Sequence, residues 1–371
     1  MKNLSIYIHI PFCSSKCAYC DFLSAPATDT VQEQYLSMLQ LEVEEEVEKL
    51  KNEYCIQSVF IGGGTPSIVD ANKLMEILKV IRLKMNLSED VEITIECNPG
   101  TLSKDKLQTY YEGGINRLSI GLQSTHNHIL SKLGRIHTFE TFLEGYKLAR
   151  KVGFHNINID LMSALPEQTY SDYRETLETI IKLKPEHISA YSLIIEEGTP
   201  FYDMDLNLPT EDTERDMYYL TKELLEKSAY HRYEISNYSK EGYECKHNKV
   251  YWERGEYVAF GLGASSFMGE KRYKNQSNIK KYISKDWEKE EVESLDVLEQ
   301  ISEFFFLGLR EIQGVNMEVC NALYGEKGLK EYKQIIAKQI QLGLLEKEGE
   351  WLKLTEKGID VSNQVFVEFL L

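Results

Sequence analysis

The sequence predicts an α/β protein, in which a partial (β/α)6 TIM-like barrel or a doubly wound parallel sheet is followed by a mostly α C-terminal domain with a winged-helix-like end. Over residues 1–200, short runs rich in β-branched residues alternate with longer segments whose apolar residues recur at helical spacing. After Leu208-Pro209 this alternation stops. A chain of 371 residues exceeds one average domain, so we expect one large domain and one small one.

Six runs are the expected strands of the barrel: SIYIHI, SVFIGG, VEITIEC, RLSIGL, NINIDLM and HISAYSL, which begin at Ser5, Ser58, Val91, Arg117, Asn156 and His187. One apolar stripe between the first two runs predicts a helix, and a second stripe follows the second run. The stripes comprise Val31, Tyr35, Leu39, Val43, Val47, Leu50 and Tyr54, and then Leu74, Ile77, Leu78, Ile81 and Met85. The acidic residues Glu42, Glu44, Glu45 and Glu46 are typical of a solvated helix face.

Parallel strands joined by covering helices bury both faces of their sheet, which accounts for runs that are nearly continuous in apolar residues. In such barrels the functional residues collect at the carboxyl ends of the strands. The cysteine loop and the segments GGGTP, ECNPG, GLQS and DLM all fall at those ends. We therefore expect one mouth to gather all five segments.

The rest of the chain divides into two further parts. A helix is expected over residues 211–227, and an aromatic-rich connecting region follows it. Near the C-terminus, Leu344-Leu345 and Trp351-Leu352 flank a turn at Gly349, as in a winged-helix end. The predicted boundaries are 1–230 for the barrel, 231–290 for the connecting region and 291–371 for the C-terminal domain.

Composition narrows the class of protein. A hydrophobic fraction of 42% with 27% charged residues is ordinary for a soluble globular protein, and a net charge of -17 disfavours nucleic acid as a partner. The N-terminus lacks the apolar stretch of a signal peptide, so a cytoplasmic location is expected. Seven cysteines, an odd number, do not suggest a disulfide framework. Cys55, Cys97 and Cys320 adjoin apolar residues and are expected to be small buried hydrophobes.

Three cysteines lie close together in the motif CxxxCxxC, formed by Cys13, Cys17 and Cys20. By spacing alone this motif suits a 4Fe-4S cluster, a zinc site or a redox dithiol. A zinc site needs a fourth ligand, for which His9 is the nearby candidate, and a dithiol leaves Cys13 without a role. Three thiolates on a 4Fe-4S cluster leave one iron open to a ligand from outside the protein.

Two further features of the predicted mouth are weaker signals. Gly62-Gly63-Gly64-Thr65-Pro66 lets the backbone approach a ligand closely, although a tight turn alone would explain it. Glu96 ends the third run, where a buried carboxylate needs a hydrogen-bond donor such as a ribose hydroxyl, an ammonium group or a neighbouring arginine.

The segment YIHIPFCSSKCAYCDF resembles the cluster loop of the radical S-adenosylmethionine (SAM) enzymes, in particular the oxygen-independent coproporphyrinogen III oxidase group. ECNPG, IGLQS, LGRIHT and IDLMSALP match the motifs of that group in order, and LGLREIQGV resembles its C-terminal domain. The resemblance implies a radical SAM barrel with a 4Fe-4S cluster on Cys13, Cys17 and Cys20, and S-adenosylmethionine on the fourth iron. It also implies cofactor contacts from Tyr7, Tyr19, Gly63, Gly64, Thr65, Glu96, Gln123, Arg135 and Asp160, with Tyr19 near the adenine.

Two features separate this chain from the oxidases themselves. The oxidases have another cysteine two residues after the third ligand, where this chain has Asp21-Phe22. The segment ECKHNKVYW, which contains His247, resembles the HNxxYW motif of the heme chaperones of this family. Neutral imidazole is a good axial ligand of heme iron, although a single histidine more often has a structural role. Cys245 is a weaker second candidate, expected on the same face of a strand as His247.

The resemblance implies a fold able to cleave S-adenosylmethionine and leaves the function with alternatives. The first is a heme chaperone that binds heme and delivers it to acceptor proteins such as respiratory-chain components, with flavodoxin or ferredoxin as electron donor. Peripheral membrane contact and a monomer or homodimer are compatible with it. The second is oxidative decarboxylation of coproporphyrinogen III. A third, nucleic-acid binding through the winged-helix end, is disfavoured because Lys330, Lys333 and Lys338 lack a wider basic surface.

Overall fold

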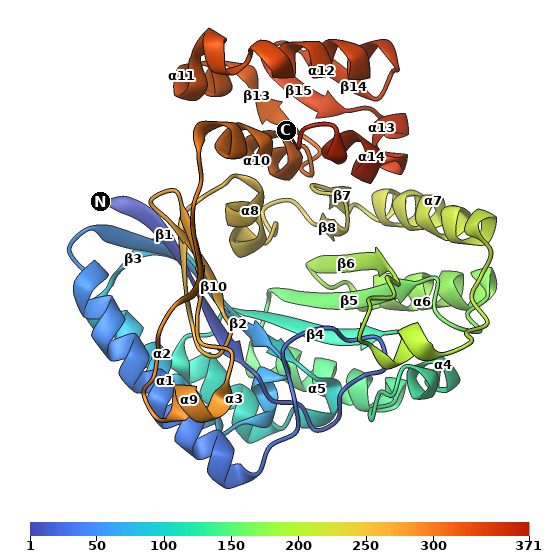
Figure 1. Cartoon of the computed structure of the whole chain (residues 1–371). Helices are drawn as coiled ribbons and strands as arrows, with labels where there is room; N and C mark the ends of the chain where they lie inside the picture. Colours follow the sequence, from blue (N-terminus) through green and yellow to red (C-terminus); the bar gives the residue numbers. More distant parts are fainter. Residues whose placement is uncertain (371) are drawn as a thin grey trace.

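The computed structural model describes residues 1–370, and a twelve-stranded sheet dominates it (Figure 1). The strand order is β12-β11-β10-β9-β1-β2-β3-β4-β5-β6-β8-β7. Strands β1 to β6 pair in parallel in chain order. This partial (β/α)6 barrel is built from β1 (Lys2–Ile10), β2 (Tyr54–Gly63), β3 (Asn86–Cys97), β4 (Arg117–Gln123), β5 (Ile157–Ser163) and β6 (His187–Ser192), which confirms the six predicted runs.

Helices cover the outer face of the barrel, and most begin at a polar cap. Five of them begin directly after Thr28, Asp70, Ser103, Thr138 or Thr169, whose side chains accept a hydrogen bond from the backbone N–H three residues on. The helices are α1 (Asp29–Leu50), α2 (Ala71–Lys84), α3 (Lys104–Gly113), α4 (Asn127–Lys132), α5 (Phe139–Val152) and α6 (Tyr170–Leu183). Helix α7 (Glu211–Lys227) coincides with the predicted helix 211–227.

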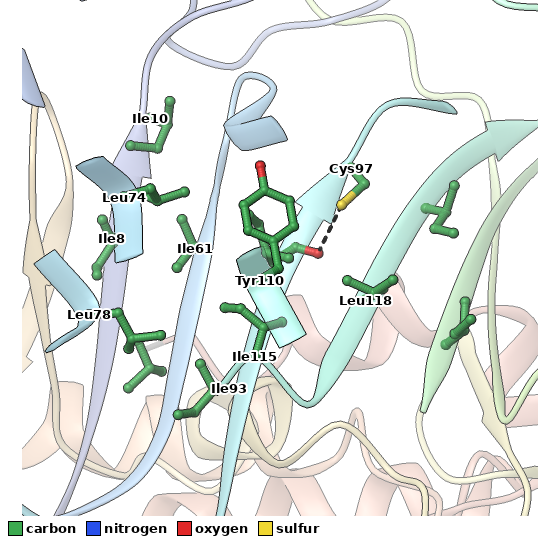
Figure 2. Close-up of a cluster of buried hydrophobic side chains, with 14 of the residues drawn as sticks. Ile8, Ile10, Ile61, Leu74, Leu78, Ile93, Cys97, Tyr110, Ile115 and Leu118 are labelled. Carbon is green, nitrogen blue, oxygen red and sulfur yellow. Dashed lines mark hydrogen bonds between the residues drawn. The ribbon is translucent and has the colours of Figure 1, made fainter. Parts of the chain in front are cut away.

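The two faces of the barrel strands differ in chemistry. Side chains that face the helices are aliphatic, and Figure 2 shows Ile8, Ile61, Ile93 and Leu118 on neighbouring strands, with Leu74 of α2 beside them. The opposite face of the same strands is mostly polar and includes Ser5, His9, Ser58, Glu92, Thr94, Glu96, Arg117, Ser119, Asn158, Asp160, His187 and Ser189. The strands therefore alternate between aliphatic residues on the outer face, which packs against the helices, and polar residues on the inner face. The expectation of nearly continuous apolar runs was wrong.

The region predicted as a connector adds strands to both edges of the same sheet. The strands β7 (His231–Arg232) and β8 (Asn237–Ser239) extend the β6 edge. At the other edge β9 (Tyr257–Phe260) pairs parallel to β1, and β10 (Ser265–Met268), β11 (Lys271–Lys274) and β12 (Glu290–Ser294) follow antiparallel. The short helix α8 (Lys246–Trp252) joins β8 to β9, and the short helix α9 (Ile279–Ile283) joins β11 to β12. The boundaries at residues 230 and 290 stay a prediction.

The C-terminal unit has its own core and sits beside α8 and β7 in Figure 1. It contains α10 (Val297–Gly308), β13 (Val315–Asn316), α11 (Met317–Gly328), α12 (Lys330–Gln341), β14 (Leu345–Glu348), β15 (Trp351–Leu354), α13 (Glu356–Asp360) and α14 (Ser362–Val367). Phe305 packs against both Tyr332 and Phe369, with ring centroids 5.4 and 4.8 Å away, and those two rings lie 6.5 Å from each other. The hairpin of β14 and β15 around Gly349 confirms the predicted winged-helix-like end.

Four local predictions were wrong, among them the burial of Cys55, which is only half-buried. Glu42 is not solvated, because it is 1% exposed and accepts hydrogen bonds from Tyr282 Oη (2.6 Å) and Gly261 N (2.8 Å). Tyr54 begins β2 and does not extend the first helical stripe. Cys245 is the N-cap of a helix, so the expected strand geometry does not apply to it. Within residues 1–370, no helix has the length and apolar content needed to cross a lipid bilayer.

Candidate functional site

A cavity of about 500 Å³ opens at the carboxyl ends of the barrel strands and extends into the polar interior. Eleven of the thirteen predicted site residues line it. They are Cys13, Cys17, Tyr19, Cys20, Gly63, Gly64, Thr65, Glu96, Gln123, Arg135 and Asp160. Tyr7 and His247 are not among the lining residues. Parallel topology explains this convergence, because it brings the ends of all six strands to one edge.

The cysteine loop is fixed against the barrel by backbone hydrogen bonds. Ala18 N donates to Leu133 O at 3.1 Å, and Phe201 N donates to Ala18 O at 3.0 Å. Donors also reach two of the sulfurs: Thr65 Oγ1 lies 3.5 Å from Cys13 Sγ, and Arg135 Nη1 lies 3.6 Å from Cys17 Sγ. These contacts help to fix the positions of the two sulfurs, which would bind iron as thiolates.

The cysteines are arranged for a cluster more readily than for a single ion. In the part of the chain that the structure describes, no three His, Cys, Asp or Glu side chains form a group able to hold one metal ion. A 4Fe-4S cluster takes one thiolate per iron, so its ligands stand further apart than those of one ion. His9, the candidate fourth zinc ligand, is occupied elsewhere, because its Nε2 lies 2.9 Å from Leu23 O and its Nδ1 3.1 Å from Tyr7 Oη.

The glycine turn brings bare backbone to the edge of the cavity. Gly63 has φ 111°, and a Cβ there would lie 2.5 Å from the His9 ring. A Cβ on Gly64 would lie 2.6 Å from the carbonyl oxygen of Phe12. Side chains are therefore excluded at both positions, which leaves backbone groups to face the cavity. The absence of side chains at Gly63 and Gly64 fits a cofactor that is bound by main-chain atoms.

Two half-buried carboxyl groups, those of Glu96 and Asp160, line the cavity. Glu96 accepts a hydrogen bond from Gly63 N at 3.0 Å, and Asp160 accepts one from Asn158 Nδ2 at 2.7 Å. Burial, followed by the charge of Asp160, raises the pKa of Glu96 to about 8. Burial also raises the pKa of Asp160. A cationic ligand would lower both pKa values, so the pair suits a ligand that carries positive charge.

Gln123 and Arg135 present unused polar atoms to the same space. Gln123 ends β4 with φ 73°, a left-handed conformation that costs free energy for a residue with a side chain. Its Oε1 is buried without a partner, and so is Arg135 Nε, while Arg135 Nη2 donates to Gly121 O. Unpaired buried polar atoms are costly, and a polar ligand would satisfy them.

The two tyrosines predicted to contact the cofactor differ in position. Tyr19 lines the cavity between two cysteines, with its ring 6.5 Å from that of Phe201. Burial raises its pKa. Tyr7 lies deeper along β1, where its hydroxyl contacts His9 and its ring stacks on Phe60 at 6.3 Å. As the structure stands, Tyr7 supports the barrel wall.

His247 lies in the closed end of the barrel and is 1% exposed. Its ring stacks on Phe60 at 5.1 Å, its Nδ1 lies 2.8 Å from Ser58 Oγ, and its Nε2 lies 2.8 Å from Tyr251 Oη. Because Ser58 Oγ donates to Ser5 Oγ, the consistent tautomer has Nδ1–H donating to Ser58 and Nε2 accepting from Tyr251. Burial, assisted by the charge of Arg117, lowers the pKa of His247 to about 3, so the ring is neutral.

Helix α8, which carries the HNxxYW segment, packs inside the barrel against β2 and β3. The Glu92 carboxylate accepts hydrogen bonds from Lys246 N and His247 N, both at 3.2 Å, and Cys245 Sγ lies 3.5 Å from it. Of this motif it is Asn248, and not His247, that lines the cavity. Cys245 is fully buried, and burial raises the pKa of its thiol to about 12.

Several lining residues were missed from the sequence, among them Arg117, Ser119, Asn158, Ser189, Tyr191, Asn237 and Asn248. A signal for the strand residues was present. In RLSIGLQ, NINIDLM and HISAYS, every second residue is polar or glycine with few exceptions. This period of two is typical of a strand that has one polar face. Asn237 comes from outside the parallel strands and had no comparable signal, whereas Asn248 belongs to the HNxxYW motif but was not among the predicted site residues.

Comparison with known proteins places the whole chain. Residues 7–180 match the family model of the radical SAM superfamily, and residues 295–361 match the HemN C-terminal domain. The chain is 37% identical to the heme chaperone HemW of Lactococcus lactis over 100% of this chain and 98% of the relative. It is 36% identical to HemW of Bacillus subtilis over 99% of each chain, and 39% identical to that of Escherichia coli over 71% and 70%.

Among solved structures, the chain is similar to one described as coproporphyrinogen III oxidase (HemN) from Escherichia coli, a radical SAM enzyme. The TM-score is 0.87, with 99% of this chain and 90% of that chain covered, at 21% sequence identity. At that identity the likeness establishes the fold, a radical SAM barrel with a helical C-terminal domain, and nothing about the substrate.

Proposed function

The chain belongs to the heme chaperone HemW family, and from that premise we propose that it binds heme, a 4Fe-4S cluster and S-adenosylmethionine, and delivers heme to acceptor proteins. The observation that carries the proposal is the convergence of the cysteine loop, the glycine turn and the Glu96–Asp160 pair on one cavity. These three features lie far apart in the sequence. A 4Fe-4S cluster with bound S-adenosylmethionine requires all three at one place.

Cys13, Cys17 and Cys20 are the proposed cluster ligands, with Thr65 and Arg135 donating to the first two sulfurs. Gly63, Gly64 and Thr65 present backbone to the cofactor, while Glu96, Gln123 and Asp160 offer acceptors to its cationic and hydroxyl groups. Tyr19 covers the loop and limits water. When reduced, the bound cluster supplies one-electron cleavage of the carbon–sulfur bond of S-adenosylmethionine.

Heme is the proposed cargo, with His247 as its axial ligand. Because His247 is buried and both its nitrogens are bonded, ligation requires α8 to move away from Ser58 on β2 and requires Tyr251 to release Nε2. We propose further that the protein works in the cytoplasm, receives electrons from a small carrier such as flavodoxin or ferredoxin, and passes heme to proteins such as respiratory-chain components.

The deciding experiment uses anaerobically reconstituted protein with reductant, S-adenosylmethionine, and either heme or coproporphyrinogen III. We expect a saturable shift of the heme Soret band and no protoporphyrinogen IX. Cys17→Ser should remove the visible absorption of the cluster, whereas the matched variant Cys55→Ser, at a half-buried cysteine outside the cavity, should retain it.

Formation of protoporphyrinogen IX with stoichiometric consumption of S-adenosylmethionine would establish the oxidase alternative instead. Absence of any Soret shift in cluster-loaded protein would overturn the heme proposal and leave the cofactor assignment standing. The names of the relatives favour the chaperone over the oxidase.

A further inference from the structure

One buried cation in the cofactor cavity, the guanidinium of Arg117, has no hydrogen-bonded counter-ion. Arg117 is 2% exposed, lines the cavity, and has an Nε that is buried without a hydrogen-bond partner. Among residues 1–370, the carboxylate oxygen within 4 Å of its guanidinium is Glu92 Oε2, 3.9 Å from Nε, which is beyond hydrogen-bonding distance.

The neighbouring carboxylates are engaged with other groups. Glu92 accepts from the backbone N–H groups that begin α8. Glu96 Oε2 accepts from Gly63 N, and Asp160 Oδ1 accepts from Asn158 Nδ2. A buried guanidinium without a hydrogen-bonded anion is costly. Because the three carboxylates bond other groups, Arg117 can bind the anionic group of a ligand.

A second unpartnered polar group lies on the same cavity wall. Asn237 is 7% exposed, and its Oδ1 is buried without a partner. Ser119, Asn158 and Ser189 also line this part of the cavity, and Ser189 and Ser119 both bond Asn158. We propose that Arg117 and these neutral side chains form a second subsite, which holds a small organic carboxylate at the floor of the barrel.

The carboxylate of the cofactor is not the expected occupant, a step that rests on the proposed function. That function places the cofactor carboxylate at the cluster, beside the cysteine loop at the mouth. Arg117 begins β4 and Gln123 ends it, six residues later, which corresponds to about 20 Å along the strand. The floor therefore lies well below the cluster, and a cavity of about 500 Å³ leaves room there for a small molecule and not for a tetrapyrrole.

The test measures binding of 3,3,3-trifluoropropionate by ¹⁹F NMR, with the neutral amide of the same acid as the control ligand. Wild-type protein should broaden the carboxylate signal saturably and leave that of the amide unchanged. Arg117→Met should weaken carboxylate binding by roughly tenfold or more, because a charged hydrogen bond is lost. Equal broadening by wild type and Arg117→Met would overturn the proposal.

A second pair of variants keeps the arginine in place. Ser119 shares a strand face with Arg117, so Ser119→Asp supplies an internal carboxylate that should occupy the guanidinium and exclude the probe. Ser119→Asn, matched in size and neutral, should retain binding. Probe binding unchanged in Ser119→Asp would overturn the assignment.

The last arm identifies the source of the carboxylate in cluster-loaded protein. We expect S-adenosylmethionine to leave probe binding intact. Arg117→Met should weaken cofactor binding far less than probe binding, because the lost charge acts on the cofactor only through the protonation of Glu96 and Asp160. If the cofactor displaces the probe and Arg117→Met weakens cofactor binding equally, the subsite belongs to the cofactor and the second-ligand assignment is wrong. Neither result bears on heme binding, which is measured separately.

Discussion

Replacing Tyr251 by Phe should tighten heme binding if His247 is the axial ligand. The Tyr251 hydroxyl donates to His247 Nε2 at 2.8 Å, so it occupies the lone pair that iron would use. Tyr251 lies four residues after His247 on α8, and the bond therefore persists even when the helix moves as a unit. In the wild type this hydroxyl must give up its bond before iron can bind, whereas its removal leaves the nitrogen free from the start.

The size of the effect follows from the bond that competes with iron. A buried neutral hydrogen bond contributes about 1 kcal/mol net, and removing that competition corresponds to about a fivefold lower heme dissociation constant. His247→Ala would be harder to interpret. It leaves Tyr251 Oη without a partner and a void against Phe60, so a loss of about 2–4 kcal/mol in unfolding free energy is expected alongside any heme effect.

The assay is a heme titration followed by the Soret band, with Tyr257→Phe as the matched control. Tyr257 contacts the Tyr251 ring at 4.8 Å, but its hydroxyl accepts from Arg272 and not from His247. The control variant should bind heme as the wild type does. Unchanged or weaker binding by folded Tyr251→Phe would refute His247 Nε2 as the ligand, since the freed lone pair would then confer no advantage.

Three further outcomes follow from the cavity and the buried histidines. Affinity for S-adenosylmethionine should rise with pH up to about 8, where Glu96 loses its proton, and calorimetry should find this dependence absent in Glu96→Gln. Gly63→Ala should abolish measurable cofactor binding, because its Cβ would lie 2.5 Å from the His9 ring at φ 111°; equal binding by folded variant and wild type would contradict that. Burial lowers the pKa of His137 to about 4 and that of His247 to about 3. Below about pH 6.5 the unfolded chain therefore takes up protons that the folded chain does not. The free energy of unfolding, measured with urea, should then fall as the pH is lowered, by up to about 1.4 kcal/mol per pH unit for each histidine. The fall should be less steep in His137→Asn.

The strands and the mouth of the barrel were predictable because their signals are local. Parallel strands need short β-branched runs, and the topology then fixes where the residues after each run must meet. Cys13, Gly64 and Glu96 could thus be assigned to one site although they lie far apart in sequence, and the structure brings them to one cavity.

The corrections concern contacts that no local pattern encodes. Glu42 sits in an acidic run on a helix, and only the return of the chain some 220 residues later brings Gly261, Asn275 and Tyr282 against it. The apolar outer residues of each strand dominate the sequence pattern, and polar inner residues such as Ser119 and Asn158 were not among the predicted site residues. The inside of a barrel that must hold a polar ligand cannot be packed with aliphatic side chains.

Helix α8 links the proposed heme ligand to the cofactor cavity within a single short segment. Asn248 lines the cavity, His247 packs on Phe60 inside the barrel, and the Trp252 ring lies 4.6 Å from the Arg310 guanidinium of the C-terminal unit. Exposing His247 would therefore alter the cavity wall and the contact with the C-terminal unit together. Any movement of α8 that favours heme binding must therefore change the affinity for the cofactor. By thermodynamic linkage, cofactor binding must change the affinity for heme by the same factor. Titrating heme with and without S-adenosylmethionine, and the cofactor with and without heme, should give equal ratios of dissociation constants that differ from one. Ratios equal to one would mean that heme binds without moving α8, and hence away from His247.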